Sequence, residues 1–155
     1  MPRMLESALG TVNPSPAINP GQQIAGNQWR EEIDVYSIDV NDSFNATHRV
    51  KLPDGEWEPL HGHDWHVTAH FRTEILDTNG MVVDFLEAGE ALRSILNAWN
   101  HADLNQHPDF ADAPPTAEIV ARRILEKLEE RGLQQIARVS VVEAPGCTAT
   151  FEKTG

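Results

Sequence analysis

The chain has 155 residues, 40% of them apolar, so it suits a single domain with a core of its own. Its net charge of −12 would repel nucleic-acid backbones and anionic membrane surfaces, so we expect neither as a partner. The one cysteine excludes an internal disulfide and a cysteine-rich zinc site, and no stretch resembles a signal peptide or a membrane span, so we expect a cytoplasmic protein.

The first 28 residues differ in composition from the rest of the chain. They contain the segment NPSPAINPG and further Gly, Asn and Gln, so they cannot bury much surface. We therefore expect a flexible extension at residues 1–28 and one domain at residues 29–155.

The first predicted element is a strand from Ile33 to Val50. Side chains two apart in a strand share a face, and the sequence alternates imperfectly between apolar and polar residues. One face would carry Phe44, Ala46, His48 and Val50. The Pro-Asp-Gly turn at residues 53–55 predicts that the next strand runs antiparallel to this one.

The second predicted strand contains four of the seven histidines. Its apolar face would carry His61, His63, Trp65, Val67, Ala69 and Phe71. His66 and His70 would lie on the polar face, where they need no partner. An Asn79-Gly80 turn follows.

Two helices are predicted next, from apolar residues at helical spacing. Asp84 would cap the first helix, whose buried stripe would be Leu92, Ile95, Leu96 and Trp99. Thr116 would cap the second helix and Gly132 would end it. The buried stripe of this second helix would be Ile119, Val120, Ile124 and Leu128.

The chain closes with a strand from Ile136 to Glu143, a Pro145-Gly146 turn and a last strand. Cys147 would be a small packed side chain in that last strand. The order strand, strand, helix, helix, strand, strand predicts an α+β fold (ββααββ), in which two helices cover one face of a four-stranded antiparallel sheet.

His48, His61 and His63 would face the same way from two adjacent strands. Three nitrogen ligands leave the fourth tetrahedral position open, which is typical of catalytic zinc. The alternative is that all three are core histidines satisfied by hydrogen bonds. A cupin-type site is disfavoured because its glutamate ligand should follow within a few residues, whereas the first glutamate after His63 is Glu74.

Six short motifs, in this order, resemble the 6-pyruvoyl-tetrahydropterin synthase and 6-carboxytetrahydropterin synthase family: FNATHR, LHGHDW, VVDF, NHADLN, PTAE and VVEAP. The resemblance covers about residues 33–152. It implies the tunnelling fold (T-fold) and a homohexamer with active sites between subunits. It also implies zinc on His48, His61 and His63, and a pterin substrate.

The resemblance further implies residues that hold the pterin. Glu143 would accept a forked pair of hydrogen bonds from the 2-amino group and the N–H of the ring, and Thr116 and Glu118 would help to seat the ring. The alternatives are a solvated strand-end charge for Glu143 and, for Glu118, a first-turn glutamate that the helix dipole favours without any ligand.

The sequence departs from the family pattern at two places. Trp57 stands where the family usually has its proton-accepting cysteine. Glu58 in EPLHGH matches the glutamate of a class III-like variant, whereas the nearby Glu56 does not occupy that position of the motif. Asn100 and His101 stand where the family commonly has Asp-His. His101 remains a candidate acid or base, whose tautomer Asn100 could fix without stabilising the imidazolium as a carboxylate would.

The resemblance to the glutamate-containing variant implies a zinc-dependent lyase acting on the side chain of dihydroneopterin or its triphosphate, with Glu58, His101 and Glu143 as catalytic residues. It also implies that the product would be 6-hydroxymethyl-dihydropterin for folate synthesis. Two alternatives stay open. One is a 6-carboxytetrahydropterin synthase of queuosine biosynthesis, and the other is a paralogue that binds zinc and a pterin without turnover.

Overall fold

The computed structural model of the chain describes residues 34–154. The predicted extension at residues 1–28 and the predicted start of the domain at residue 29 lie outside this part. The described elements follow the predicted order: β1 (Tyr36–His48), β2 (His61–Thr73), α1 (Phe85–Trp99), α2 (Ala117–Glu130), β3 (Ile136–Ala144) and β4 (Cys147–Glu152). Two short 3-10 helices that were not predicted lie between α1 and α2: η1 (Leu104–Gln106) and η2 (Pro108–Phe110).

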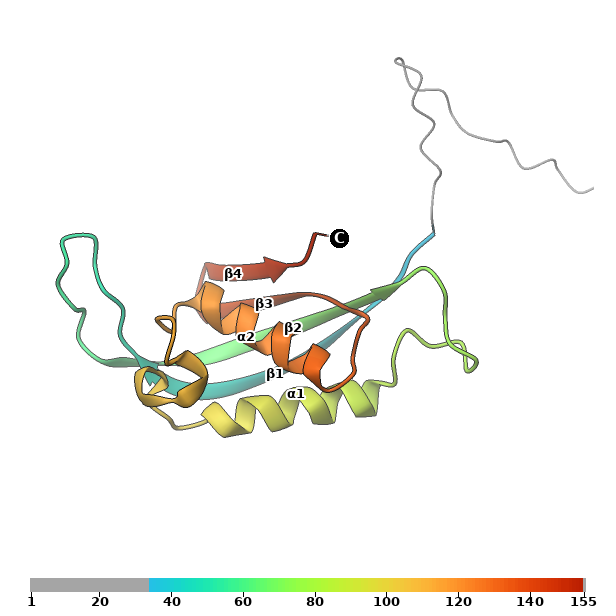
Figure 1. The fold of residues 1–155 in the computed structure, drawn as a ribbon, viewed down its shortest axis with the longest axis horizontal. Helices are drawn as coiled ribbons and strands as arrows, with labels where there is room; N and C mark the ends of the chain where they lie inside the picture. Colours follow the sequence, from blue (N-terminus) through green and yellow to red (C-terminus); the bar gives the residue numbers. More distant parts are fainter. Residues whose placement is uncertain (1–33, 155) are drawn as a thin grey trace, which may run out of the picture. The chain divides into compact units, whose positions relative to one another are not determined.

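The four strands form one antiparallel sheet in the order β1-β2-β3-β4. Helix α1 packs against β1, and α2 packs against β3 and β4, so both helices cover the apolar face of the sheet (Figure 1). The loop between β1 and β2 projects beyond the end of the sheet (Figure 1). The predicted α+β fold is therefore confirmed.

The predicted faces of the first two strands are also confirmed. Alternate side chains of both strands are buried: Phe44, Ala46, His48, Trp65, Val67, Ala69 and Phe71. His66 and His70 lie in the opposite row, as predicted. His70 nevertheless has a partner, because its Nδ1 lies 2.5 Å from Oδ1 of Asp39 on the neighbouring strand.

Both long helices begin where the sequence predicts. Asp84 accepts a hydrogen bond from the N–H of Leu86, and Thr116 accepts one from the N–H of Ile119. The predicted stripes are buried except for Ile119, which is only partly buried. Gly132 follows α2 with a φ of 89°, the left-handed conformation that ends many helices. No helix within residues 34–154 is long and apolar enough to cross a membrane.

An aromatic layer forms the core beside the end of β1. The rings of Phe44 and Trp65 stack at a centroid distance of 5.8 Å, and Trp99 contacts Phe44 at 5.9 Å. The indole N–H of Trp65 donates to the carbonyl of Ala46 at 3.3 Å. Cys147 was wrongly predicted to be packed: it is exposed, because it opens the edge strand β4 directly after the turn.

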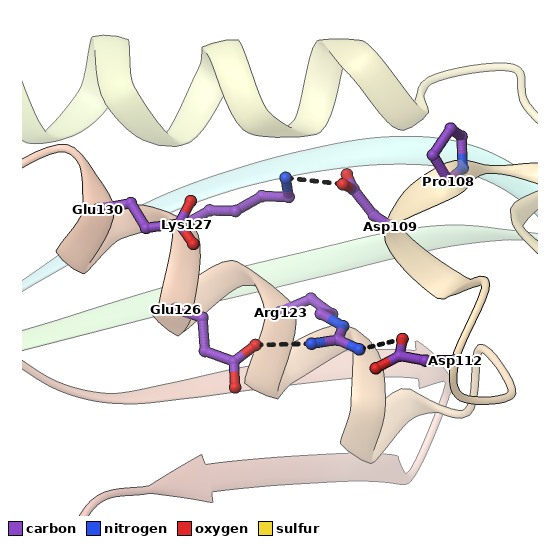
Figure 2. A pocket seen from close by; sticks show the side chains of 7 residues that line it. All are labelled: Pro108, Asp109, Asp112, Arg123, Glu126, Lys127 and Glu130. Atoms are coloured by element: carbon purple, nitrogen blue, oxygen red, sulfur yellow. Dashed lines mark hydrogen bonds and ion pairs between the residues drawn. The ribbon is translucent and has the colours of Figure 1, made fainter.

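The loop between α1 and α2 is held by ionic contacts (Figure 2). Asp109 accepts one hydrogen bond from the indole N–H of Trp99 at 2.7 Å and forms an ion pair with Lys127 at 2.8 Å. Arg123 is paired with Glu126 at 2.9 Å and also with Asp112. These contacts tie the loop to the last residue of α1 and to α2. The residues drawn in Figure 2 line a pocket, and none of them belongs to the histidine cluster described below.

Candidate metal and substrate site

The three predicted histidines converge at the ends of β1 and β2. His48 lies directly opposite His61 in the antiparallel register, and His63 lies opposite Ala46. The ring centroids are 4.8 Å apart for His48 and His61, 5.2 Å for His48 and His63, and 4.7 Å for His61 and His63. With Glu143 they form a group whose candidate ligand atoms all lie within 4.8 Å of one another. This group could bind a metal ion.

Backbone carbonyls set the tautomers of two of these rings. Nδ1 of His48 lies 2.8 Å from the carbonyl oxygen of Pro115, and Nδ1 of His61 lies 2.8 Å from that of Pro59. A carbonyl can only accept, so each Nδ1 carries the proton that it donates. In the neutral ring, Nε2 is then a free lone pair, which is the usual arrangement of a histidine that binds a metal.

The inward nitrogens are not satisfied by the protein. Nε2 of His48 and Nε2 of His63 are buried and have no hydrogen-bond partner within residues 34–154. Leaving a buried polar atom unpaired costs roughly 1–3 kcal/mol. The alternative of core histidines satisfied by hydrogen bonds therefore does not account for Nε2 of His63, whereas a metal ion would account for both atoms.

Burial also keeps His63 in the form that binds metals. It lowers the pKa of His63 from its ordinary value of 6.5, and the neighbouring His48 and His61 act in the same direction. The carboxylates of Glu143 and Glu58 oppose this effect but do not outweigh it. Burial of His63 therefore favours the neutral imidazole.

Glu143 reaches the cluster from β3 through a β-bulge. Val142 pairs with Thr148 and Ala144 pairs with Cys147, so Glu143 is an extra residue on its strand. Bulges commonly re-aim a side chain next to a functional site. Oε1 of Glu143 lies 2.8 Å from Nε2 of His48 and is only partly exposed. The carboxylate of Glu143 therefore lies beside the histidines and is not a fully solvated charge at the strand end.

Glu58 is held at the rim of the cluster. Its Oε1 accepts a hydrogen bond from the N–H of Val50 at 2.8 Å and lies 3.9 Å from Nδ1 of His61. Glu56 is exposed in the turn. Trp57 is half exposed, and the guanidinium of Arg49 lies 5.2 Å from the centre of its ring. Of the two neighbouring glutamates, only Glu58 therefore touches the site.

The structure corrects the role considered for Asn100. Its side-chain oxygen accepts a hydrogen bond from the N–H of Asn45 at 2.9 Å, so it holds the loop against β1 and does not bind the ring of His101. His101 itself donates its backbone N–H to the carbonyl of Asn45 at 2.6 Å. Asp103, the nearest carboxylate along the chain, accepts a hydrogen bond from the N–H of Asn105 as the cap of η1.

His101 has the left-handed φ of 60°, unlike any other described residue except glycines. Its side chain is exposed and is not part of the histidine cluster. A residue with a side chain is rare in this conformation, and such outliers are concentrated at functional sites. The conformation therefore favours a functional side chain at this position without assigning its role.

Thr116 and Glu118 lie at the start of α2. The hydroxyl of Thr116 caps α2, and the preceding Pro115 supplies the carbonyl that binds His48. Glu118 is exposed in the first turn of α2. Sequence reasoning missed the carbonyls of Pro59 and Pro115 and the N–H of Val50, because backbone groups leave no signal in the residue types.

Comparison with known proteins agrees with the resemblance of the motifs. The family model of 6-pyruvoyl tetrahydropterin synthase matches residues 37–154. The chain is 33% identical to dihydroneopterin monophosphate aldolase of Pyrococcus furiosus, over 65% of this chain and 83% of that protein. It is 32% identical to 6-carboxy-5,6,7,8-tetrahydropterin synthase of Synechocystis sp., over 69% of this chain and 84% of that protein.

Solved structures show the same fold. The 6-pyruvoyl tetrahydropterin synthase of Caenorhabditis elegans aligns with a TM-score of 0.67 at 22% identity, over 81% of this chain and all of that chain. The Plasmodium vivax enzyme of the same name aligns with a TM-score of 0.64 at 20% identity, over 77% of this chain and 98% of that chain. Together with the family model, this shows that the chain belongs to the 6-pyruvoyl tetrahydropterin synthase family.

Proposed function

We propose that the protein is a zinc-dependent lyase that shortens the side chain of dihydroneopterin, or of its triphosphate, to give 6-hydroxymethyl-dihydropterin for folate synthesis. Lyase action on a pterin side chain follows from the family and from the two relatives named above. The finer proposal is supported by one observation above all: the carboxylate of Glu58 is fixed at the rim of the histidine cluster.

The residues present fit a zinc ion. His48, His61 and His63 would hold it through Nε2, since the carbonyls of Pro115 and Pro59 engage the opposite nitrogens of two of the rings. A zinc ion bound there would act as a Lewis acid toward the oxygens of the substrate side chain.

The proton transfers are assigned to the protein. Glu58 would take a proton from a side-chain hydroxyl of the substrate, and the hydrogen bond from Val50 holds its carboxylate at the rim of the cluster. His101 would serve the complementary transfer. Glu143 would bind the N–H groups of the pterin ring, because a carboxylate can accept two parallel hydrogen bonds, and Thr116 and Glu118 would help to seat the ring.

A 6-carboxytetrahydropterin synthase of queuosine biosynthesis is the second candidate, because the relative of that name is as similar as the aldolase. The third candidate is a paralogue that binds zinc and a pterin without turnover. It is favoured by Trp57 and Asn100, which stand where the family usually has a cysteine and an aspartate. In the structure Asn100 accepts a hydrogen bond from Asn45 of β1, and Trp57 packs with Arg49.

We also propose a homohexamer with active sites between subunits. Part of the β1 edge is already occupied within the chain: the N–H of Thr47 donates to Ala102 at 2.9 Å, beside the contacts of Asn45. The first half of β1 and the outer edge of β4 have no neighbouring strand among the described residues, and ring formation would pair such edges. Light scattering that shows a monomer at micromolar concentration would contradict this assembly.

The substitution Glu58→Gln tests the proposed function. It keeps the size of the side chain and an acceptor for the N–H of Val50 but removes proton transfer, so turnover should fall about 10²–10⁴-fold. Glu56→Gln is the matched control and should cost little. Full turnover by a Glu58→Gln protein that still binds zinc and pterin would overturn the glutamate-dependent mechanism.

A further inference from the structure

We infer that Glu143 is a fourth metal ligand in the substrate-free protein, and that the pterin ring displaces it when substrate binds. The inference rests on the proposed metal site and assigns that site a closed resting state. One oxygen atom of Glu143 lies close to two of the histidines: its Oε1 is 2.8 Å from Nε2 of His48 and 3.6 Å from Nε2 of His63.

The shorter contact joins a carboxylate oxygen and an imidazole nitrogen. Nδ1 of His48 donates its proton to the carbonyl of Pro115, so Nε2 is the nitrogen that faces Glu143. A nitrogen and a carboxylate oxygen stay at 2.8 Å only with a positive charge between or beside them, either a proton on Nε2 or a metal ion. A proton on His48 would leave the buried Nε2 of His63 unpaired, whereas a metal ion engages both nitrogens and the carboxylate.

The spacing suits a single tetrahedral ion. Nitrogen and oxygen ligands lie about 2.0–2.2 Å from zinc, which places neighbouring ligand atoms roughly 3.4 Å apart around a tetrahedron. The distances from Oε1 to the two histidine nitrogens, 2.8 and 3.6 Å, fall on either side of that value. A small rotation of the carboxylate would equalise them, and the bulge at Glu143 already aims it at the cluster.

Glu143 then has two tasks that exclude each other. A carboxylate that accepts the forked pair from a pterin ring is turned away from the metal, so ring binding would vacate the fourth position. The substrate side chain could occupy that position only after the ring is seated. Ring recognition and metal access are thereby coupled through one side chain.

Cobalt(II) titration of the full chain tests this assignment, because the visible spectrum of cobalt reports its ligands. Glu143→Gln and Glu143→Ala should change the spectrum of the substrate-free protein and weaken cobalt binding at least 10-fold, since even residues that only orient metal ligands contribute about 10–100-fold. Adding dihydroneopterin should change the spectrum of the wild type, because the pterin ring would draw the carboxylate of Glu143 away from the metal.

Two further variants separate the possible failures. Glu56→Gln makes the same chemical change at an exposed glutamate and should leave the spectrum as in the wild type. If Glu143→Gln and Glu143→Ala are folded by circular dichroism and keep the wild-type spectrum and affinity, while His63→Ala loses cobalt, then Glu143 is not a ligand and the metal site stands. If His63→Ala also keeps cobalt, the metal site itself is wrong.

Discussion

Replacing Asp109 with Ala should destabilise the fold, because this one carboxylate joins three elements. It accepts the indole N–H of the fully buried Trp99 at 2.7 Å and pairs with Lys127 at 2.8 Å, and its side chain is only 22% exposed. A hydrogen bond to a charged group contributes about 1.5–3 kcal/mol. The two contacts share one carboxylate and are not additive, so we expect a loss of about 3 kcal/mol in the free energy of unfolding.

The pH dependence of this effect has a definite sign. Burial alone would raise the pKa of Asp109 from its ordinary value of 3.8, but hydrogen bonds from Lys127 and Trp99 outweigh burial and lower it. A lowered folded-state pKa means that the stabilisation is complete well above pH 4 and is lost as the pH falls through the folded-state value. Asp109→Asn keeps an acceptor for Trp99. It should therefore be less stable than the wild type at pH 7, and this difference in stability should disappear in acid.

Urea unfolding of the full chain, followed by circular dichroism at pH 7 and pH 3, measures both effects. A loss below about 1 kcal/mol for Asp109→Ala at pH 7 would refute the magnitude argued from these contacts. An equal deficit of Asp109→Asn at both pH values would refute the assigned ionisation.

Two further predictions concern the site. His63→Ala should abolish zinc binding measured by equilibrium dialysis, whereas His66→Ala, on the opposite face of β2, should retain it; equal loss in both would contradict the assignment of the faces. His101→Gly should leave the free energy of unfolding within about 0.5 kcal/mol of wild type. Glycine relieves the backbone strain at φ 60°, and this gain offsets the greater conformational freedom that glycine gives the unfolded chain. Turnover should nevertheless fall about 10²–10⁴-fold, because the imidazole is lost. Unchanged turnover would remove His101 from the mechanism.

The parts of the site that the sequence predicts are those governed by strand periodicity. Alternation places His61 and His63 in the row of Trp65, and the turn at residues 53–55 makes the neighbouring strand antiparallel, which brings His48 opposite. The helix starts were predictable for a similar reason, because Asp84 and Thr116 carry the side chains that caps require. Local chemistry decides these features, and local chemistry is visible in the sequence.

The remaining features depend on contacts between distant segments or on backbone atoms. The carbonyl of Pro115 reaches His48 across 67 positions, and Asn100 reaches Asn45 across 55. The bulge that aims Glu143 depends on the register of β3 and β4 and not on residue type. The exposure of Cys147 follows from its place at the open edge of the sheet, which alternation alone does not define.

The central claim is that this site cleaves a pterin side chain with the help of zinc and Glu58. The most direct measurement is to incubate the zinc-loaded protein separately with dihydroneopterin and with its triphosphate, and to identify the products by mass. We predict 6-hydroxymethyl-dihydropterin from at least one of them, formed by the wild type and largely lost in Glu58→Gln. Formation of 6-carboxytetrahydropterin instead, or of no product from either substrate, would contradict the account.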